Sequence, residues 1–481
     1  MAFLIGGANT LDDAYTIDNS VRFNDNDSSF LRRTFSGGSR TTFTISFWLK
    51  RGNILTSDMN LFDAYKDDNN RVFVYFVNDD LRIFGKSAAT TYIDVLTDRK
   101  FRDPSAWYHF VIAFDTTQGT EGNRIKVYVN GVQETSFSTY DVLENYATFF
   151  NDNTRTHTVG TRDDSGGEEG FYDGYMSEVH YIDGAQKAAS DFGETNDNGV
   201  WIPKDCKADL TYGTNGYYLE FQQTGTGTAS TSTIGADTSG NTNHLTSTNL
   251  AALDITVDTP TNNFATLNPL NLRLGKGITF SEGNTQIQTG TTGGTVGGFS
   301  TIAGLKSGKW YAEFKPTVVG TNATMRFGIE STDFNAADGL CNVAASAYAS
   351  NGNKGRNATD TSHGDSYDDN DIIGVAVDLD NGAIYFSKNG TWQNSSDPES
   401  GASKTGAAYT DILTILPTGG YMFAFNFVYN NSQQENVQAN FGNPCNAISS
   451  GNADANGYGN FEYAVPSGYY SLCTKNLAEY G

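Results

Sequence analysis

Residues 371–392 read DIIGVAVDLDNGAIYFSKNGTW and carry the clearest structural signal in the chain. Two runs of β-branched and aromatic residues stand on either side of an Asp-Asn-Gly sequence at 380–382. Asn-Gly between such runs is a strong hairpin signal, because a type I′ turn needs positive φ at both central residues. The same pair recurs at 389–390 and 130–131. The pattern predicts antiparallel strands joined by tight turns.

The same β pattern extends outward through both halves of the chain. Residues 42–49 alternate, which places Phe43, Ile45 and Phe47 on one face of a strand. Residues 72–77 are continuously apolar, as expected for a strand that is covered on both faces. Amphipathic helical stretches are nearly absent, although residues 185–192 could form two helical turns. We therefore predict an all-β protein of the sandwich type.

The charge balance excludes several classes of partner. The 481 residues include 31 Lys and Arg against 55 Asp and Glu, so the net charge is −24. Affinity for nucleic acid comes mainly from Lys and Arg, so we expect no nucleic-acid partner. No apolar stretch approaches the ~20 residues that span a bilayer, so we expect no membrane insertion. The opening MAFLIGGANT lacks the basic and apolar regions of a signal peptide, so none is expected.

Shifts in composition suggest domain boundaries. We predict β-sandwiches at 1–200 and 301–447, a Thr/Gly/Asn-rich connector with short strands at 201–300, and a C-terminal packing segment at 448–481. The composition leaves open whether the connector is a third module or completes its neighbours.

The four cysteines are far apart, so without an export signal we expect reduced thiols rather than disulfides. They are Cys206, Cys341, Cys445 and Cys473.

Two sets of motifs resemble known β-sandwich families. The order WYHFVIAFD (107–115), IKVYVNG (125–131) and FYDGYMSEVHYIDG (171–184) resembles a laminin-G-like, concanavalin-type domain. The stretch 371–392, together with VQANFGNP (437–444), resembles a SPRY domain. The resemblance implies two concanavalin-type or jelly-roll antiparallel β-sandwiches joined by a β-containing connector.

Three further segments resemble parts of tailed (marine-type) bacteriophage virion proteins, including tail-fibre adhesins. They are SVRFNDNDSSFLRRTF (20–35), TPTNNFATLNPL (259–270) and VPSGYYSLCTKNL (465–477). The resemblance implies a protein on the virion surface, assembled in the host cytoplasm, that contacts other virion proteins and binds a bacterial surface polysaccharide or glycan. Multivalent display would strengthen such binding and favours a homotrimer. The alternative is a capsid-decorating or fibre-linking protein that contacts mainly other virion subunits.

A glycan-cleaving enzyme is the third hypothesis, because concanavalin-type sandwiches include glycoside hydrolases. Retaining glycosidases need two carboxylates ~5–5.5 Å apart. The Glu-x-Asp-x-x-Glu run of the family hydrolases is absent. Glu168, Glu169, Asp173 and Glu178 are close in sequence, but their Gly-rich surroundings indicate a loop. We therefore expect no catalytic activity and no catalytic residue.

Clusters of Asp and Asn make calcium the one cofactor to consider. Calcium takes 6–8 oxygen ligands, and laminin-G-like domains often hold one calcium at a loop rim. Asp67, Asp68 and Asn69, between two strand-like runs, are the first choice for a metal site. The competing interpretation is ordinary turn chemistry, because Asp and Asn favour turns.

Glycan binding also needs exposed aromatic rings beside polar groups. Tyr65, Tyr348 and Trp392 stand in polar, loop-like surroundings and are the candidate ligand-binding residues. The competing interpretation for each is a partly buried anchor of its loop. Other aromatic residues and one histidine stand in strands, where a core position is expected. These are Trp48, Trp107, Trp310 and His109.

Overall fold

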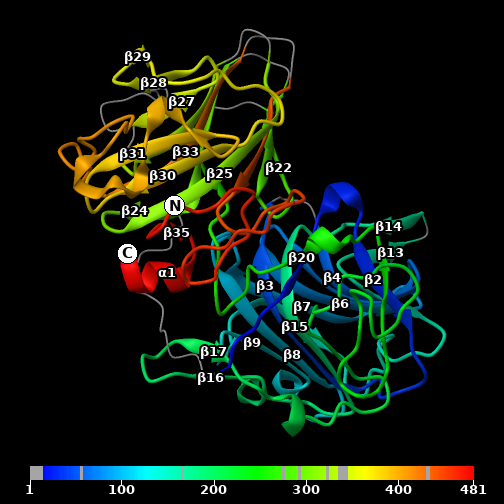
Figure 1. The fold of residues 1–481 in the computed structure, drawn as a ribbon. Helices are drawn as coiled ribbons and strands as arrows, with labels where there is room; N and C mark the ends of the chain where they lie inside the picture. Colours follow the sequence, from blue (N-terminus) through cyan, green and yellow to red (C-terminus); the bar gives the residue numbers. More distant parts are fainter. Residues whose placement is uncertain are drawn as a thin grey trace. The chain divides into compact units, whose positions relative to one another are not determined.

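The computed structural model describes residues 15–54, 58–164, 166–273, 277–290, 294–320, 324–333, 345–429 and 434–481. The chain forms two compact units, an N-terminal unit of Asp12–Thr261 and a C-terminal unit that includes Asn262–Gly481. Each unit is built from two large β-sheets, and this confirms the all-β prediction (Figure 1). In the described part of the chain, no helix is long and apolar enough to cross a membrane.

The N-terminal unit packs two antiparallel sheets face to face. In spatial order, the first sheet contains β10 (Val132–Gln133), β9 (Ile125–Val129), β8 (Trp107–Asp115), β3 (Thr42–Arg51), β15 (Gly174–Asp183), β1 (Ser20–Phe23) and β20 (Ile255–Thr256), and β18 (Tyr217–Leu219) pairs with β15. The second contains β11 (Phe137–Val142), β7 (Thr90–Lys100), β6 (Asp80–Ser87), β5 (Asn70–Val77), β4 (Met59–Asp67), β12 (Thr156–Val159), β2 (Phe30–Thr34) and β19 (Thr246–Thr248). Two small hairpins are added, β13 (Arg162–Asp164) with β14 (Gly167–Glu169) and β16 (Gly193–Thr195) with β17 (Trp201–Pro203).

Alternation along the strands builds the core between these two sheets. Phe43, Ile45 and Phe47 of β3 are fully buried and belong to the same apolar cluster as Val72 and Val74 of β5. Successive side chains of a strand point to opposite faces, so every second residue enters the core. The predicted inward face of residues 42–49 is confirmed.

The C-terminal unit repeats this two-sheet plan. Its seven-stranded sheet contains β21 (Leu267–Arg273), β24 (Gly294–Leu305), β33 (Tyr421–Tyr429), β26 (Thr324–Ser331), β27 (Ser346–Ala349), β28 (Asn353–Arg356) and β29 (Thr359–Ser362). The facing sheet contains β22 (Thr279–Ser281), β23 (Gln286–Gln288), β34 (Asn436–Asn440), β25 (Lys309–Val318), β30 (Ile373–Asp378), β31 (Ala383–Lys388) and β32 (Thr391–Trp392), and β35 (Tyr470–Ser471) pairs with β25. Helix α1 (Thr474–Tyr480) adds Leu477 to the core.

Short 3-10 segments take the place of longer helices. Residues 185–192, expected to form two helical turns, contain only the segment Ala189–Asp191. The segments are η1 (Asp25–Asp27), η2 (Glu121–Asn123), η3 (Ala189–Asp191), η4 (Lys207–Asp209), η5 (Ala252–Asp254), η6 (Gln393–Ser395) and η7 (Pro398–Ser403).

The predicted hairpins are present, with one difference in turn geometry. Asn130-Gly131 joins β9 to β10 with φ of 48° and 80°, as a type I′ turn requires. The hairpin of β30 and β31 pairs Asp378 with Ala383, and Gly382 alone in its loop has positive φ. The Asp378 carboxylate accepts hydrogen bonds from the backbone amides at 380 and 381, which draws this loop into a different shape.

Residues 201–300 are divided between the two units. In the N-terminal unit, β18, β19 and β20 pair with β15, β2 and β1. A buried ion pair holds this part of the chain, since Lys50 Nζ lies 2.7 Å from Asp258 Oδ2 and neither side chain is exposed beyond 1%. In the C-terminal unit, β21 and β24 pair with each other and β23 pairs with β34.

The described cysteines lie in the interior. Cys206 and Cys473 form no disulfide and are buried. Burial raises the pKa of their thiols to about 12 and about 11, so both are protonated at neutral pH. Cys445 is also buried, and Cys341 lies outside the described residues.

Candidate functional site

The outer face of the second sheet of the N-terminal unit carries paired charged and aromatic side chains. Strand register places Asp63 of β4 opposite Phe73 of β5, Phe73 opposite Phe84 of β6, and Phe84 opposite Asp94 of β7. Their neighbours along the strands face the core, so this row points away from it. We call the outward residues of β4–β7 the charged face. It consists of Asp63, Tyr65, Arg71, Phe73, Tyr75, Arg82, Phe84 and Asp94.

Arg82 is the centre of the charged face. Its Nε and Nη2 each donate to one carboxylate oxygen of Asp94 at 2.8 Å, and its Nη1 donates to the Tyr75 hydroxyl at 3.1 Å. The guanidinium also lies over the Phe84 ring, 5.0 Å from its centre. The hydrogen bonds to Asp94 raise the pKa of Arg82 further above its usual value. The side chain keeps 27% of its surface exposed and remains within reach of a ligand.

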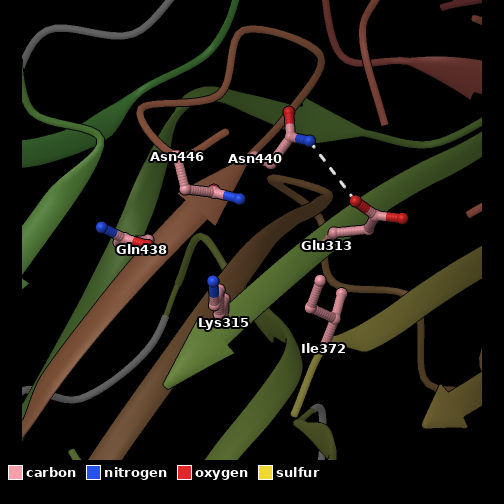
Figure 2. A pocket seen from close by; sticks show the side chains of 6 residues that line it. All are labelled: Glu313, Lys315, Ile372, Gln438, Asn440 and Asn446. Atoms are coloured by element: carbon pink, nitrogen blue, oxygen red, sulfur yellow. Dashed lines mark hydrogen bonds between the residues drawn. The ribbon is translucent and has the colours of Figure 1, made fainter. Parts of the chain in front are cut away.

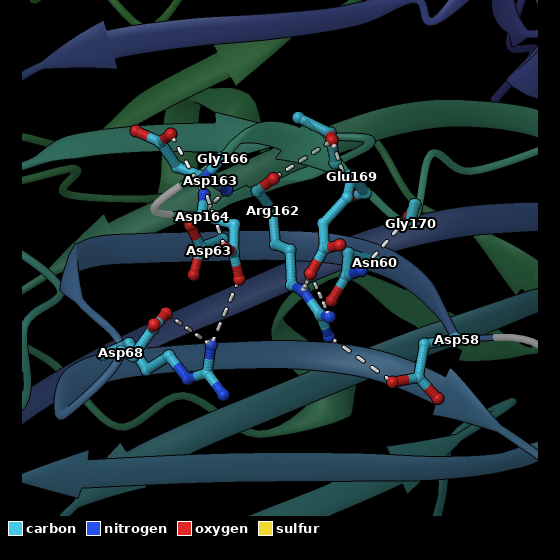
Figure 3. Close-up of polar contacts among 12 residues, drawn as sticks. Asp58, Asn60, Asp63, Asp68, Arg162, Asp163, Asp164, Gly166, Glu169 and Gly170 are labelled. Carbon is cyan, nitrogen blue, oxygen red and sulfur yellow. Dashed lines mark hydrogen bonds and ion pairs between the residues drawn. The ribbon is translucent and has the colours of Figure 1, made fainter. Parts of the chain in front are cut away.

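The β13–β14 hairpin adds a second group of charges beside this row (Figure 3). Arg162 is hydrogen bonded to Glu169 and lies 3.4 Å from Asp58, while Arg71 lies 3.6 Å from Asp164. Both guanidinium groups also cover the Phe73 ring, at 5.6 Å and 5.3 Å from its centre. These two guanidinium groups cover the outward side of β5, whose residues 72–77 are continuously apolar. For this reason the outward side of β5 is almost completely buried.

Asp63 anchors the hairpin and is itself fully buried. Its Oδ2 accepts a hydrogen bond from the backbone N–H of Asp163 at 3.0 Å. Its Oδ1 has no hydrogen-bond partner among the described residues. Burial raises the pKa of Asp63 well above its usual value, despite the nearby Arg71 and Arg162. The carboxyl is therefore costly to ionise where it stands.

We expect Asp63→Asn to stabilise the N-terminal unit by about 1–3 kcal/mol at neutral pH, because the amide still accepts from Asp163 and carries no buried charge. The folded pKa of Asp63 lies above the unfolded value of about 3.9, so its ionisation costs stability as pH rises through that interval. The gain should therefore shrink as the pH falls toward about 4. Urea unfolding of wild type and variant across this range measures it.

The matched control is Asp98→Asn on the same sheet, where the side chain is exposed. This change should alter the free energy of unfolding by less than about 0.5 kcal/mol. A lower stability of Asp63→Asn at neutral pH would contradict the argument, because it would mean that Arg71 and Arg162 stabilise the ionised form more than burial opposes it.

The outer face of the other sheet in this unit is covered by its own chain. Residues between 185 and 212, among them Phe192 and Tyr212, pack over it. His109 is enclosed there, with its ring nitrogens hydrogen bonded to Ser46 and Trp201 at 2.9 Å and 3.0 Å. Burial lowers the pKa of His109 to about 3, so it is a neutral core residue, as expected. The charged face is therefore more accessible than the outer face of the first sheet.

The four carboxylates considered for catalysis are Glu168, Glu169, Asp173, which is fully buried, and Glu178, and they are not all on one strand. Glu168 and Glu169 are on β14, beside the charged face. Glu178 is on β15 in the other sheet, where it accepts hydrogen bonds from Tyr218 and Tyr15. Burial raises the pKa of Glu178 to about 7. Sequence proximity in this segment therefore does not place Glu178 on the same sheet as Glu168 and Glu169.

Tyr65 and the candidate calcium ligands come together at one end of the charged face. The Tyr65 hydroxyl donates to Asp68 at 3.3 Å, and Asp68 lies 3.7 Å from Arg71. Asp67 accepts from the Asn69 backbone N–H and from the Asn70 amide at 2.8–3.1 Å. The hydrogen bonds from Asn70 lower the pKa of Asp67.

These contacts do not fit a calcium site. Calcium needs 6–8 oxygen ligands, whereas the Asp67 carboxylate already caps its own turn and Asp68 faces a guanidinium group. Within the described ranges, no group of three or more His, Cys, Asp or Glu side chains is arranged to hold a metal. The turn-chemistry interpretation accounts for these residues.

Tyr348 and Trp392 lie in the C-terminal unit, so they are not in the same site as Tyr65. A sugar platform at Tyr348 requires an exposed ring, and this ring is fully buried against Tyr367 and Phe386. Its hydroxyl donates to the Asp365 carbonyl. Trp392 is half-buried, with its ring 6.5 Å from that of Tyr311. The expectation of an exposed ring is thus corrected for Tyr348.

Sequence reasoning did not find Arg71, Arg82 and Asp94. A signal was present, because Arg71, Phe73 and Tyr75 alternate with valines, and Arg82 and Phe84 alternate with Leu81 and Ile83. Period-two alternation of this kind marks the outward side of a strand. The pairing of the arginines with carboxylates on other strands is a consequence of sheet register.

The fold defines a protein with two β-sandwich domains. Residues 18–190 match the family described as the concanavalin A-like lectin/glucanases superfamily, and residues 309–443 match the SPRY domain family. The chain thus contains a laminin-G-like, concanavalin-type domain and a SPRY domain, as the sequence motifs predicted. No curated protein matches the chain significantly.

Similar solved structures include a SPRY domain, a pentraxin and one domain of an arabinanase. The SPRY domain of human HERC1 is 17% identical, with 36% of this chain and 96% of that chain covered and a TM-score of 0.28. A heptameric SAP-like pentraxin from Limulus polyphemus is 18% identical, with 36% and 80% covered and a TM-score of 0.26. Domain 4 of the arabinanase AbnA from Geobacillus stearothermophilus is 20% identical, with 33% and 68% covered and a TM-score of 0.24. The domain assignment stands on the two family matches.

Proposed function

We propose that this protein is a non-enzymatic glycan-binding protein and that its N-terminal sandwich binds the glycan on the charged face. The single observation that carries the proposal is the Arg82 arrangement, in which a partly exposed guanidinium lies on Phe84 and is held by Asp94. Planar charged groups fixed beside aromatic rings provide directional hydrogen bonds and an apolar surface at the same place. Sugars present hydroxyl groups and C–H faces that fit both.

The proposal includes display on a bacteriophage particle, as a tail-fibre or receptor-binding protein at the virion surface. The three phage-like segments at 20–35, 259–270 and 465–477 support this part of it. The glycan would then be a polysaccharide of the bacterial surface, and the other partners would be virion proteins. A single shallow site binds weakly, so several copies, as in a homotrimer, would raise the avidity.

Binding of the purified protein to a panel of immobilised bacterial surface polysaccharides, with and without added calcium, tests the glycan part. We expect at least one polysaccharide to be retained and no reducing sugar to be released from it during prolonged incubation. No binding under either condition would overturn the proposal, and release of sugar would replace it with the glycan-cleaving alternative.

A further inference from the structure

Lys50 and Asp258 meet on the outer face of the first sheet of the N-terminal unit. Lys50 Nζ lies 2.7 Å from Asp258 Oδ2, and the two side chains are 1% and 0% exposed. Leu49, the neighbour of Lys50 on β3, faces the core between the sheets, so Lys50 points outward. Asp258 follows β20 near the end of the unit, and the pair joins residues that are 208 positions apart in the sequence.

Aromatic side chains enclose the pair. The strand register places Lys50 between Trp107 of β8 and Tyr175 of β15. The centre of the Tyr175 ring is 5.6 Å from Lys50 Nζ. Trp107 and Tyr175 belong to one buried apolar cluster with Ile17 and Trp48. Charges removed from water lose much of their solvation, so these surroundings favour a reaction that eliminates both charges.

Trp107 also holds the second oxygen of the Asp258 carboxylate. Its indole Nε1–H donates to Asp258 Oδ1 at 3.1 Å. The ammonium therefore contacts one carboxylate oxygen and the indole contacts the other. An N–H donor aimed at a carboxyl oxygen stabilises the negative charge that develops there when a nucleophile attacks the carbon.

We propose that Lys50 and Asp258 condense to an isopeptide bond, an amide between the two side chains, with release of one water molecule. A proton first passes from Nζ to Oδ2 along their hydrogen bond, which leaves a neutral amine beside a neutral carboxylic acid. After a rotation of the carboxyl group, the amine lone pair attacks Cγ, and the oxyanion forms at Oδ1, to which Trp107 donates. A second proton moves from nitrogen to the Oδ2 hydroxyl, the Cγ–Oδ2 bond breaks, and water leaves. The third ammonium proton stays on the amide nitrogen, so the reaction needs no other reactant.

The fixed position of the two groups makes this condensation accessible. Well-oriented groups within one molecule react as if one partner were present at about 10⁵–10⁸ M. Each chain forms the bond only once after folding, so a slow reaction is sufficient. The bond closes a covalent loop around almost the whole N-terminal unit, and a cross-link of this span stabilises a protein mainly by restricting the unfolded chain. The pair lies on the other sheet from the charged face, so the inference does not rest on the function proposed there.

Two lysines near carboxylates in the C-terminal unit lack this arrangement. Lys309 Nζ lies 3.1 Å from Asp378 Oδ2, but Lys309 is 21% exposed and the Asp378 carboxylate accepts hydrogen bonds from two backbone N–H groups of its own loop. Lys315 lines a shallow hollow with Glu313, whose carboxylate is hydrogen bonded to Asn440 (Figure 2). Contact with water and hydrogen bonds to a carboxylate both stabilise the charged forms, so we expect no condensation at either place.

Mass spectrometry of the purified full chain tests the proposal. We expect the intact mass to be lower than the sequence requires by one water molecule, and a protease digest to yield the peptides of Lys50 and Asp258 joined to each other. The digest distinguishes this bond from cyclisation at an Asp-Gly pair such as Asp183-Gly184, which also releases water. Separate peptides with unmodified Lys50 and Asp258 would overturn the proposal, and so would a water loss located elsewhere.

Lys50→Arg separates the covalent bond from the ion pair, because the guanidinium keeps its charge and is too weak a nucleophile to condense. We expect this variant to have the full mass of an unlinked chain and to migrate differently from wild type in denaturing electrophoresis, where the wild-type loop stays closed. Lys309→Arg is the matched control and should keep the wild-type water loss. A water loss retained by Lys50→Arg would overturn the assignment to Lys50. The wild-type digest decides whether the bond exists, even if Lys50→Arg fails to fold.

Discussion

Asp258→Ala is expected to destabilise the N-terminal unit by about 3–5 kcal/mol, because it removes the carboxylate that pairs with the buried Lys50 ammonium. Asp258 Oδ2 lies 2.7 Å from Lys50 Nζ, and Asp258 Oδ1 accepts a hydrogen bond from Trp107 Nε1 at 3.1 Å. Both charged side chains are within 1% of complete burial. For a unit of this size the loss corresponds to a fall in melting temperature of roughly 6–20 °C, measurable by calorimetry.

A matched control is Lys207→Ala, which breaks a surface ion pair with Glu220 in the same part of the chain. Lys207 is 43% exposed, and exposed pairs contribute about 0–1 kcal/mol. The melting temperature of this variant should stay close to that of wild type. If Asp258→Ala melted at the wild-type temperature, the stabilising role given to the Lys50–Asp258 ion pair would be wrong.

Arg82→Ala is expected to weaken glycan binding by the N-terminal sandwich about 30-fold or more. Arginine side chains that combine ring contact with bidentate hydrogen bonds are typical binding hot spots, worth about 2 kcal/mol or more. Arg82→Lys should retain only part of the affinity, because an ammonium group cannot pair with both oxygens of Asp94 in the same fixed geometry. Titration against the polysaccharide retained in the panel measures both variants.

Lys126→Ala is the control for the Arg82 variants. Lys126 points outward from β9 on the opposite sheet, and its removal takes away the same formal charge. It should bind the polysaccharide like wild type. Wild-type affinity in Arg82→Ala, with an unchanged melting temperature, would show that the glycan does not contact the charged face. Melting curves of each variant separate loss of a contact from loss of folding.

Local sequence pattern was sufficient for the fold class and for several strands and turns. Residues 42–49 alternate because one side of β3 faces the core, and this signal needs no knowledge of the partner strands. The Asn130-Gly131 turn was predictable for the same reason, since its φ angles depend on the two residues themselves. The Asp378–Ala383 loop differs because a carboxylate outside the Asn-Gly pair redirects it.

The candidate site was predicted only in part, because exposure depends on residues far along the chain. Tyr65 does lie on the charged face, at its edge. Tyr348 is buried by Tyr367 and Phe386, and the residues next to Tyr348 in the sequence do not predict those contacts. Asp67 and Asp68 make local turn contacts that a sequence pattern cannot distinguish from a metal-binding loop.

The sequence by itself determined that this chain forms two β-sandwich domains with tight turns, because alternation and turn chemistry act over a few neighbouring residues. Only the tertiary structure decided which polar side chains meet. Arg82 binds Asp94 because β6 pairs with β7. Lys50 binds Asp258, which is far away in the sequence. Such meetings depend on strand register and burial, which are properties of the assembled sheets rather than of any short stretch.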